Sequence, residues 1–275
     1  MKKLATSLVA VLALGLSVSA VSAQTVSSNV EGLNDGVLTS DPQGPSATAV
    51  TSALTFIDTF TIDFSGDGFG RAVQRPDGIG AVVADALFAN GQTGQYVEAT
   101  TCWEETATNT SGAAQDYEFS FLITPPSLRV GDFAGASDLN PNRPEISFEA
   151  TILVNGSVAF TAQAELLGGT VSHVLNETGT SLSPVFVGPG SVFGYDFSPY
   201  ADVLNLGSVP NGGSVTVKYI MKARVDTPGF ELGGRAQIGD PFDLDGTPGF
   251  TGELMPSSPV ATEESSWGQI KKGLN

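Results

Sequence analysis

The residues best suited to chemistry are aspartates grouped in two glycine-rich stretches. Asp63 and Asp67 belong to Asp-Phe-Ser-Gly-Asp-Gly, while Asp240, Asp243 and Asp245 belong to Asp-Pro-Phe-Asp-Leu-Asp-Gly. Loops of this kind can wrap a hard cation with side-chain and backbone oxygens, so the ion they favour is calcium. The second stretch is not an EF-hand, because apolar residues stand where alternate ligands belong. The alternative is that these aspartates simply cap turns through their own backbone.

Paired carboxylates suggest a second chemistry, the hydrolysis of glycosides by one acid and one base. The candidates are Glu104, Glu105, Asp116, Glu118 and Glu149. Adjacent residues of a strand point to opposite faces, so Glu104 and Glu105 are not expected to act together. In a chain with 29 acidic residues such candidates arise by chance. We therefore predict no catalytic set.

Histidine and cysteine each occur once, at His173 and Cys102. A Ser-His-Asp triad would have to use His173, and no Gly-x-Ser-x-Gly elbow accompanies it. Zinc sites draw on several such ligands, so zinc is not expected. His173 is interpreted as an ordinary surface or strand residue. Cys102 cannot form an intramolecular disulfide, and its apolar surroundings favour a buried free thiol over a reactive or intermolecular one.

The first residues have the features of an export signal. Lys2 and Lys3 precede an apolar run over 8–16, and Val21-Ser22-Ala23 fits the small-residue cleavage rule. We expect residues 1–23 to be a signal peptide, Gln24 to begin the mature chain, and the protein to be secreted or displayed on the cell surface, with the periplasm as an alternative. The run is too short to span a membrane. The formal net charge of −17 argues against nucleic acid and anionic lipid as partners.

Period-two alternation of apolar residues runs from about residue 49 to 256, with Gly and Pro clusters between the runs. This pattern predicts an all-β fold, a single large antiparallel β-sandwich of jelly-roll or Ig-like type. Clear strands are expected around Leu54–Phe64, Val97–Trp103, Tyr117–Ile123 and Val215–Val225. Residues 24–48 are rich in Ser, Asn, Gly, Asp and Pro and are interpreted as a flexible linker or arm. Residues 257–275 are expected to be a flexible tail, or a tag containing Trp267-Gly-Gln-Ile-Lys-Lys.

One hairpin can be predicted in detail. Asn155-Gly156 separates an apolar set at even positions 146–152 from another at even positions 158–166. Both sets share a face only if even positions pair with even ones. We therefore predict a three-residue loop over Val154, Asn155 and Gly156, with Gly156 left-handed as a bulge.

Two groups of residues carry a resemblance to a known family. The first comprises Trp103, the Asn109-Thr-Ser-Gly112 turn, and the aromatic strand Tyr117–Phe121 ending at Pro125-Pro126. The second is the strand Val215–Val225 followed by Gly233-Gly-Arg-Ala236 and Ile238-Gly-Asp-Pro-Phe242. About half of the chain resembles secreted β-sandwich proteins of environmental bacteria of the PEP-CTERM-associated type. The Pro-Glu-Pro anchor, membrane helix and terminal Arg cluster of that group are missing here. The resemblance implies a cell-surface or matrix role.

These observations favour a non-enzymatic extracellular protein, structural or adhesive, whose partner is a cell-surface polymer, a glycan or another copy of the chain. A carbohydrate-binding module is the second interpretation and a secreted hydrolase the third. A carbohydrate-binding face needs exposed aromatic side chains on one sheet. The aromatic residues considered for that role are Tyr96, Trp103, Tyr195 and Tyr200.

Overall fold

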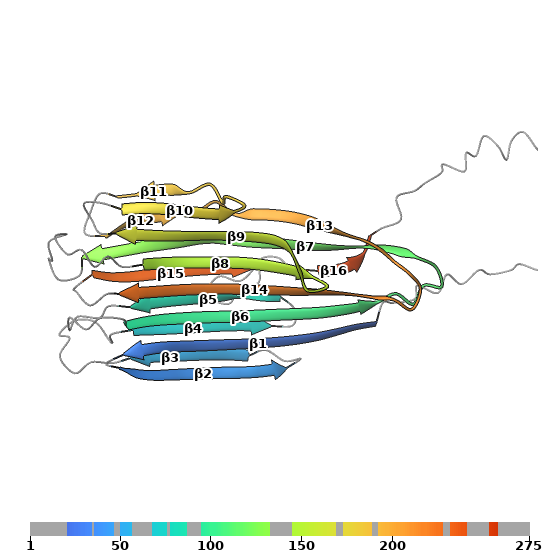
Figure 1. Cartoon of the computed structure of the whole chain (residues 1–275), viewed down its shortest axis with the longest axis horizontal. Coiled ribbons are helices and arrows are strands. Elements are labelled where there is room, and N and C mark those ends of the chain that lie inside the picture. The colour runs from blue at the N-terminus through green and yellow to red at the C-terminus, as the bar shows by residue number, and fades with distance from the viewer. Residues whose placement is uncertain are drawn as a thin grey trace, which may run out of the picture.

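A computed structural model describes residues 21–34, 36–46, 50–56, 68–75, 78–86, 95–132, 145–168, 173–188, 192–227, 232–240 and 253–257. All regular structure in these residues is β-strand. The strands form two antiparallel sheets that pack face to face as one sandwich domain, as the alternation predicted (Figure 1). The described residues contain no helix long and apolar enough to cross a membrane.

The strands of the two stacked sheets run in roughly the same direction (Figure 1). The seven-stranded sheet has the order β10 (His173–Gly179), β9 (Ser157–Gly168), β8 (Glu145–Val154), β14 (Ser214–Thr227), β6 (Gln95–Thr108), β1 (Val21–Asn34), β2 (Val37–Ser46). The nine-stranded sheet has the order β11 (Val185–Val187), β12 (Val192–Asp196), β7 (Gln115–Asp132), β15 (Leu232–Asp240), β5 (Gly78–Ala86), β4 (Gly68–Arg75), β3 (Val50–Phe56). Its remaining strands, β13 (Tyr200–Val209) and β16 (Glu253–Pro256), pair with β7.

The long strand β7 joins the two halves of the nine-stranded sheet. Its first half pairs with β13 on one side and β16 on the other. Its second half pairs with β12 and β15. The chain between β12 and β13 stays against β7, where the Phe197 amide donates to the Pro126 carbonyl. One lateral edge of the sandwich therefore carries β10 and β11, and the opposite edge carries β2 and β3 (Figure 1).

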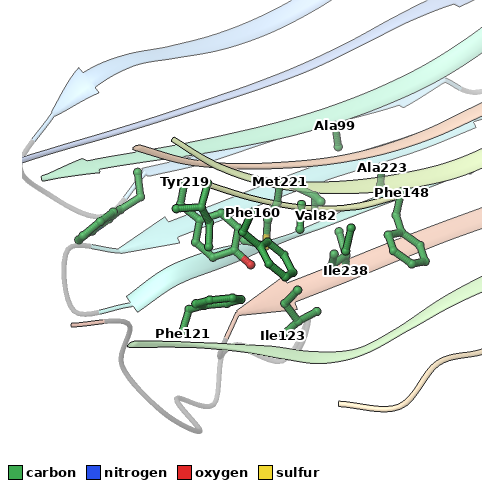
Figure 2. Close-up of a cluster of buried hydrophobic side chains, with 14 of the residues drawn as sticks. Val82, Ala99, Phe121, Ile123, Phe148, Phe160, Tyr219, Met221, Ala223 and Ile238 are labelled. Carbon is green, nitrogen blue, oxygen red and sulfur yellow. The ribbon is translucent and has the colours of Figure 1, made fainter. Parts of the chain in front are cut away.

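The core lies between the sheets and is filled by one parity of each strand. Burial alternates without a break along β6, and the inner residues of β14 from Val215 to Val225 are all buried. Trp103 stacks on Phe119 with ring centroids 5.6 Å apart. Aromatic and aliphatic side chains from both sheets interdigitate around Tyr219 and Phe121 (Figure 2). The burial of this apolar area is the main stabilising term in a chain whose one cysteine is free.

Two glycines allow the sheets to approach closely. A Cβ atom on Gly70 of β4 would collide with Val30 and Val97 in the opposite sheet. A Cβ atom on Gly234 of β15 would collide in the same way with Ile146 and Val225. The side chains of the seven-stranded sheet occupy the space that larger residues would need at these two positions.

The predicted hairpin at 146–167 is correct in its pairing and wrong in its loop. Even positions pair with even ones from Ile146↔Leu166 to Ile152↔Phe160, as burial of one face requires. The turn, however, is the two-residue Asn155-Gly156, with φ of 50° and 81°. The extra residue lies in β9, where the register shifts between Leu153↔Val158 and Ile152↔Phe160. The bulge restores the shared face and leaves Val158 exposed.

The flexible arm predicted for residues 24–48 is a further difference, because β1 and β2 occupy most of this range. β1 pairs with β6 from Val21 to Leu33, and its even positions from Val26 to Gly32 are buried against the core. Two of these inward positions of β1 are Ser28 and Gly32, so the sequence there does not show the alternation of apolar and polar residues that predicts a strand. β1 begins at Val21, so cleavage after Ala23 would leave the strand starting at Gln24, opposite Glu105.

Candidate binding surfaces

One candidate surface is a line of acidic side chains on the outer face of the seven-stranded sheet, named here the carboxylate row. Cross-strand pairing brings the row together from five neighbouring strands: Glu98 lies opposite Glu31 and Arg224, Asp226 lies opposite Glu145, and Ser147 links Arg224 to Glu165. The row comprises Glu31, Glu98, Asp226, Glu145 and Glu165. It runs across the strands on the outer face of the sheet.

Arg224 holds the centre of the carboxylate row. Its Nη1 lies 3.2 Å from Glu98 Oε2, and its Nη2 lies 2.9 Å from Asp226 Oδ2. Lys222 Nζ adds a contact of 3.3 Å to Glu98 Oε1. Burial lowers the pKa of Arg224, but the hydrogen bonds to Asp226 and Glu98 outweigh that effect and raise it. The guanidinium therefore stays charged and fixes two carboxylates in place.

Tyr96 supplies an aromatic ring beside the same arginine. The Arg224 guanidinium carbon lies 4.1 Å from the centre of the Tyr96 ring. The Tyr96 hydroxyl donates to Glu31 Oε1 at 2.9 Å. Burial and this bond to a carboxylate raise the pKa of Tyr96. The ring, the guanidinium and the carboxylates together offer donors, acceptors and an aromatic surface to a polar ligand.

The other half of the carboxylate row is crowded with like charge. Burial raises the pKa of Glu145, and the neighbouring carboxylates Glu165 and Asp226 raise it further. Asn176 Nδ2 of β10 donates to Glu165 Oε2 at 3.1 Å. The described residues contain no group of three or more His, Cys, Asp or Glu placed to hold a metal ion. The carboxylates form a line and not a cage.

A second candidate surface is the lateral edge formed by β10 and β11, named here the β10–β11 edge. Four large apolar side chains are exposed on it: Val174 (50%), Val185 (61%), Phe186 (44%) and Val187 (36%). They are half of the eight exposed large hydrophobic residues among the described residues. β10 and β11 each have a hydrogen-bonded neighbour on one side only within the described part of the chain. This edge thus combines apolar side chains with backbone groups that point outward.

His173 lies inside the β10–β11 edge. Its ring stacks on Phe186 with centroids 5.2 Å apart and planes 2° apart, and it also contacts Phe193 at 5.0 Å and Tyr195 at 5.9 Å. Its Nδ1 is buried without a hydrogen-bond partner among the described residues. The ring contacts that the described residues make with the imidazole are all aromatic. His173 is the first residue of β10, consistent with its interpretation as a strand residue.

The predicted calcium ligands fall mostly outside the described residues. Asp63, Asp67, Asp243 and Asp245 lie there, and Asp240 ends β15 opposite Gly80. The first stretch joins β3 to β4 next to the Gly68↔Ala86 pair, which lies level with Gly234. Asp240 is six residues further along β15, about 20 Å away at 3.4 Å per residue. The two stretches therefore adjoin the nine-stranded sheet at opposite ends.

The carboxylates considered for hydrolysis are dispersed. Glu104 faces outward, 3.7 Å from Lys218 Nζ. Glu105 faces inward, is 5% exposed and accepts a hydrogen bond of 2.8 Å from Gln24 Nε2. The prediction that these two neighbours lie on opposite faces is confirmed. Glu149 lies on the outer face of β8, where it accepts a hydrogen bond from Thr151. Asp116 and Glu118 belong to β7, in the other sheet.

Of the four aromatic residues considered for sugar binding, Trp103 is excluded because its side chain is only 1% exposed, in the core. Tyr200 packs on Phe160 and donates to Asp202. Tyr195 belongs to the rings around His173. Tyr96 stands on the open face of the seven-stranded sheet. Cys102 is a free, half-buried thiol on that face, and burial raises its pKa.

Comparisons with known proteins do not assign this chain to a family. No family model and no curated protein matches the chain. Among solved structures, 79% of the chain aligns with the enzymatically active domain of bacteriophage CBA120 tailspike protein 4, at 11% identity and a TM-score of 0.14. The T13 particle of infectious bursal disease virus aligns over 86% of the chain, at 9% identity and a TM-score of 0.12. The chain spans 19% of the tailspike chain. Scores this low carry no argument about fold or function.

Proposed function

We propose that this chain is a non-enzymatic extracellular protein of a bacterial cell surface or matrix, with a structural or adhesive role. The observation that carries the proposal is the β10–β11 edge. Four of the eight exposed large apolar side chains among the described residues gather there, on strands that have a hydrogen-bonded neighbour on one side only in the described part of the chain. The export signal in the sequence supports the location.

The chemistry of the β10–β11 edge suits adhesion. Soluble proteins protect sheet edges with proline, lysine or inward-pointing charge. β10 and β11 contain no proline, lysine or arginine, and all three residues of β11, Val185-Phe186-Val187, have exposed side chains. Clusters of exposed apolar side chains are typical of protein–protein contact sites. The edge therefore offers both apolar contact and main-chain pairing to a partner.

Retention by the cell envelope tests the proposal. The protein is expressed in a bacterial host and the fraction held by washed envelopes is measured for the wild type, Val185→Lys and Val37→Lys. Val185 and Val37 are valines of nearly equal exposure, 61% and 62%, on opposite edges of the sandwich. We expect Val185→Lys to reduce retention and Val37→Lys to leave it unchanged. Wild-type protein that is wholly soluble, or equal losses in both variants, would contradict the proposal.

Carbohydrate binding on the carboxylate row is the second candidate function. Tyr96, Arg224 and Glu31 favour it, since they place an aromatic ring, a fixed cation and an acceptor side by side on the outer face of one sheet. A glycan array tests it with the wild type, Tyr96→Ala and Tyr96→Phe. Tyr96→Ala should abolish binding, while Tyr96→Phe keeps the ring and should retain part of it. An array without hits removes this candidate.

A further inference from the structure

We propose that the β10–β11 edge binds a second copy of this chain, related by a two-fold axis, so that β10 pairs with β10 and β11 with β11. The inference rests on the proposed adhesive function and names the partner of that surface. It follows from the directions of the edge strands, from the chemistry of the two lateral edges and from the distribution of charge.

Strand direction favours a two-fold pair. Six antiparallel steps separate β10 from β2 in the seven-stranded sheet, and six separate β11 from β3 in the nine-stranded sheet. The two edges of each sheet therefore run in the same direction. A copy moved by simple translation would place parallel strands together, whereas a two-fold axis perpendicular to the sheets places each edge strand antiparallel to itself. Antiparallel pairing is the more stable kind and continues the pattern of both sheets.

The opposite edge of the seven-stranded sheet is protected against pairing. β2 contains Pro42 and Pro45, which lack the amide hydrogens that a further strand would need. An edge strand with two prolines cannot form an uninterrupted ladder of hydrogen bonds with a further strand. β10 offers seven residues without proline, so within the seven-stranded sheet it is the β10 edge that can accept another strand.

The β10–β11 edge also carries little charge. The chain carries a formal net charge of −17, so two copies repel each other over most of their surface. Glu177 is the single acidic residue of β10, and β11 has none. Association through the β10–β11 edge brings together the part of the surface with little charge. The remaining repulsion is long-range, so salt should strengthen the pair by screening it.

The size of the edge predicts weak association. Seven residues of β10 span about 24 Å, and two sheets about 10 Å apart with their side chains present a strip about 20 Å wide. The footprint is therefore at most about 480 Å² per copy, or about 960 Å² in total, which is below the size of stable interfaces and in the range of weak, transient ones. Weak association suits a protein concentrated on a surface or in a matrix.

Sedimentation velocity of the purified full-length secreted protein over a concentration series tests the inference. We expect a monomer–dimer equilibrium that shifts toward dimer as sodium chloride is raised from low to moderate concentration. Val185→Lys places two lysines in the two-fold contact and should weaken dimerisation by at least about tenfold, equivalent to 1.4 kcal/mol. Val37→Lys adds the same charge at the opposite edge and should leave the equilibrium unchanged.

Several outcomes would overturn the inference: a monomer at every concentration, open-ended growth beyond the dimer, or equal weakening by both substitutions. A monomer whose β10 and β11 amides resist hydrogen exchange at every dilution would show that the chain itself covers the edge. Envelope retention separates this result from the proposed function. If the protein stays monomeric yet needs Val185 for retention, it keeps its adhesive role with a different partner. If it forms the dimer but is not retained by the envelope, the proposed adhesive function is contradicted and the dimer is not.

Discussion

His173 and Phe186 stack face to face across the gap between the two sheets, with ring centroids 5.2 Å apart and planes 2° apart. The first belongs to β10 of the seven-stranded sheet and the second to β11 of the nine-stranded sheet. The stack therefore closes the sandwich along the lateral edge that we assign to partner binding. Phe186 is at once a part of the core boundary and, with 44% of its surface exposed, a part of the contact surface.

Truncating Phe186 should loosen this closure. Phe186→Ala removes the stack on His173 and the contacts with Phe193 and Tyr195. Aromatic pairs contribute about 0.5–1.5 kcal/mol beyond burial, so a loss of about 1–2 kcal/mol in the free energy of unfolding is expected for this half-exposed ring. Urea titration followed by circular dichroism measures it. Phe186→Leu keeps most of the apolar volume and should cost less; equal losses would show that ring stacking contributes nothing.

The close approach of the sheets at Gly234 predicts an overpacking effect. Gly234→Ala forces a methyl group against Ile146 and Val225, and should lower the free energy of unfolding by about 1–3 kcal/mol. Gly44→Ala in β2 is the matched control, because a Cβ atom there meets nothing within 4 Å. Urea midpoints of the two variants compare them directly. A Gly234→Ala protein as stable as Gly44→Ala would mean that the sheets are further apart than described.

The pKa of Glu145 predicts a pH dependence with a definite sign. The folded-state pKa is raised above 4.5 by burial, by Glu165 and by Asp226, so the native state binds this proton more tightly than the unfolded chain. The contribution of Glu145 to stability is therefore complete below about pH 4.5 and is lost as the pH rises through the folded-state pKa. Glu145→Gln should raise the unfolding midpoint at pH 7 and change it little at pH 4. The reverse pattern would contradict the crowding of the carboxylate row.

Calcium binding by the two aspartate stretches remains a prediction, since of their five aspartates only the backbone of Asp240 belongs to the described part of the chain. If calcium binds only the native state, saturation to a hundredfold excess over the dissociation constant adds about 2.7 kcal/mol to the free energy of unfolding. Chelation should then lower the melting temperature, and added calcium should restore it. Asp243→Asn and Asp63→Asn tested separately would show which stretch binds. A melting temperature indifferent to chelation excludes both.

Local pattern predicted the sandwich because burial alternates along most of its strands. Val215–Val225 and Tyr117–Ile123 were recognised for that reason, and their inner residues form the core. The segment 24–48 was misread because its composition resembles a linker. The informative signal there was the dipeptide Asp35-Gly36, which is typical of two-residue hairpin turns. In the structure Gly36 has a φ of 75°, and Asn34 pairs with Val37.

The candidate surfaces could not be predicted in the same way, because both depend on contacts between distant residues. The carboxylate row joins Glu31 to Glu165 through three intervening strands whose order no local pattern specifies. The stack of His173 on Phe186 depends on which strands end each sheet. At the β8–β9 hairpin the buried face predicts the pairing correctly. A three-residue loop and a two-residue turn with a bulge in β9 give that same pairing, so the buried face could not decide between them.

Hydrogen exchange of backbone amides in the presence of washed cell-envelope fragments tests most directly whether the β10–β11 edge is the contact surface. Outward-facing amides of β10 and β11 should exchange rapidly in the dilute free protein and slow on addition of envelopes, while those of β2 keep their free rate. Slowed exchange confined to β6, β14 and the carboxylate row, or no change at any strand, would contradict the account.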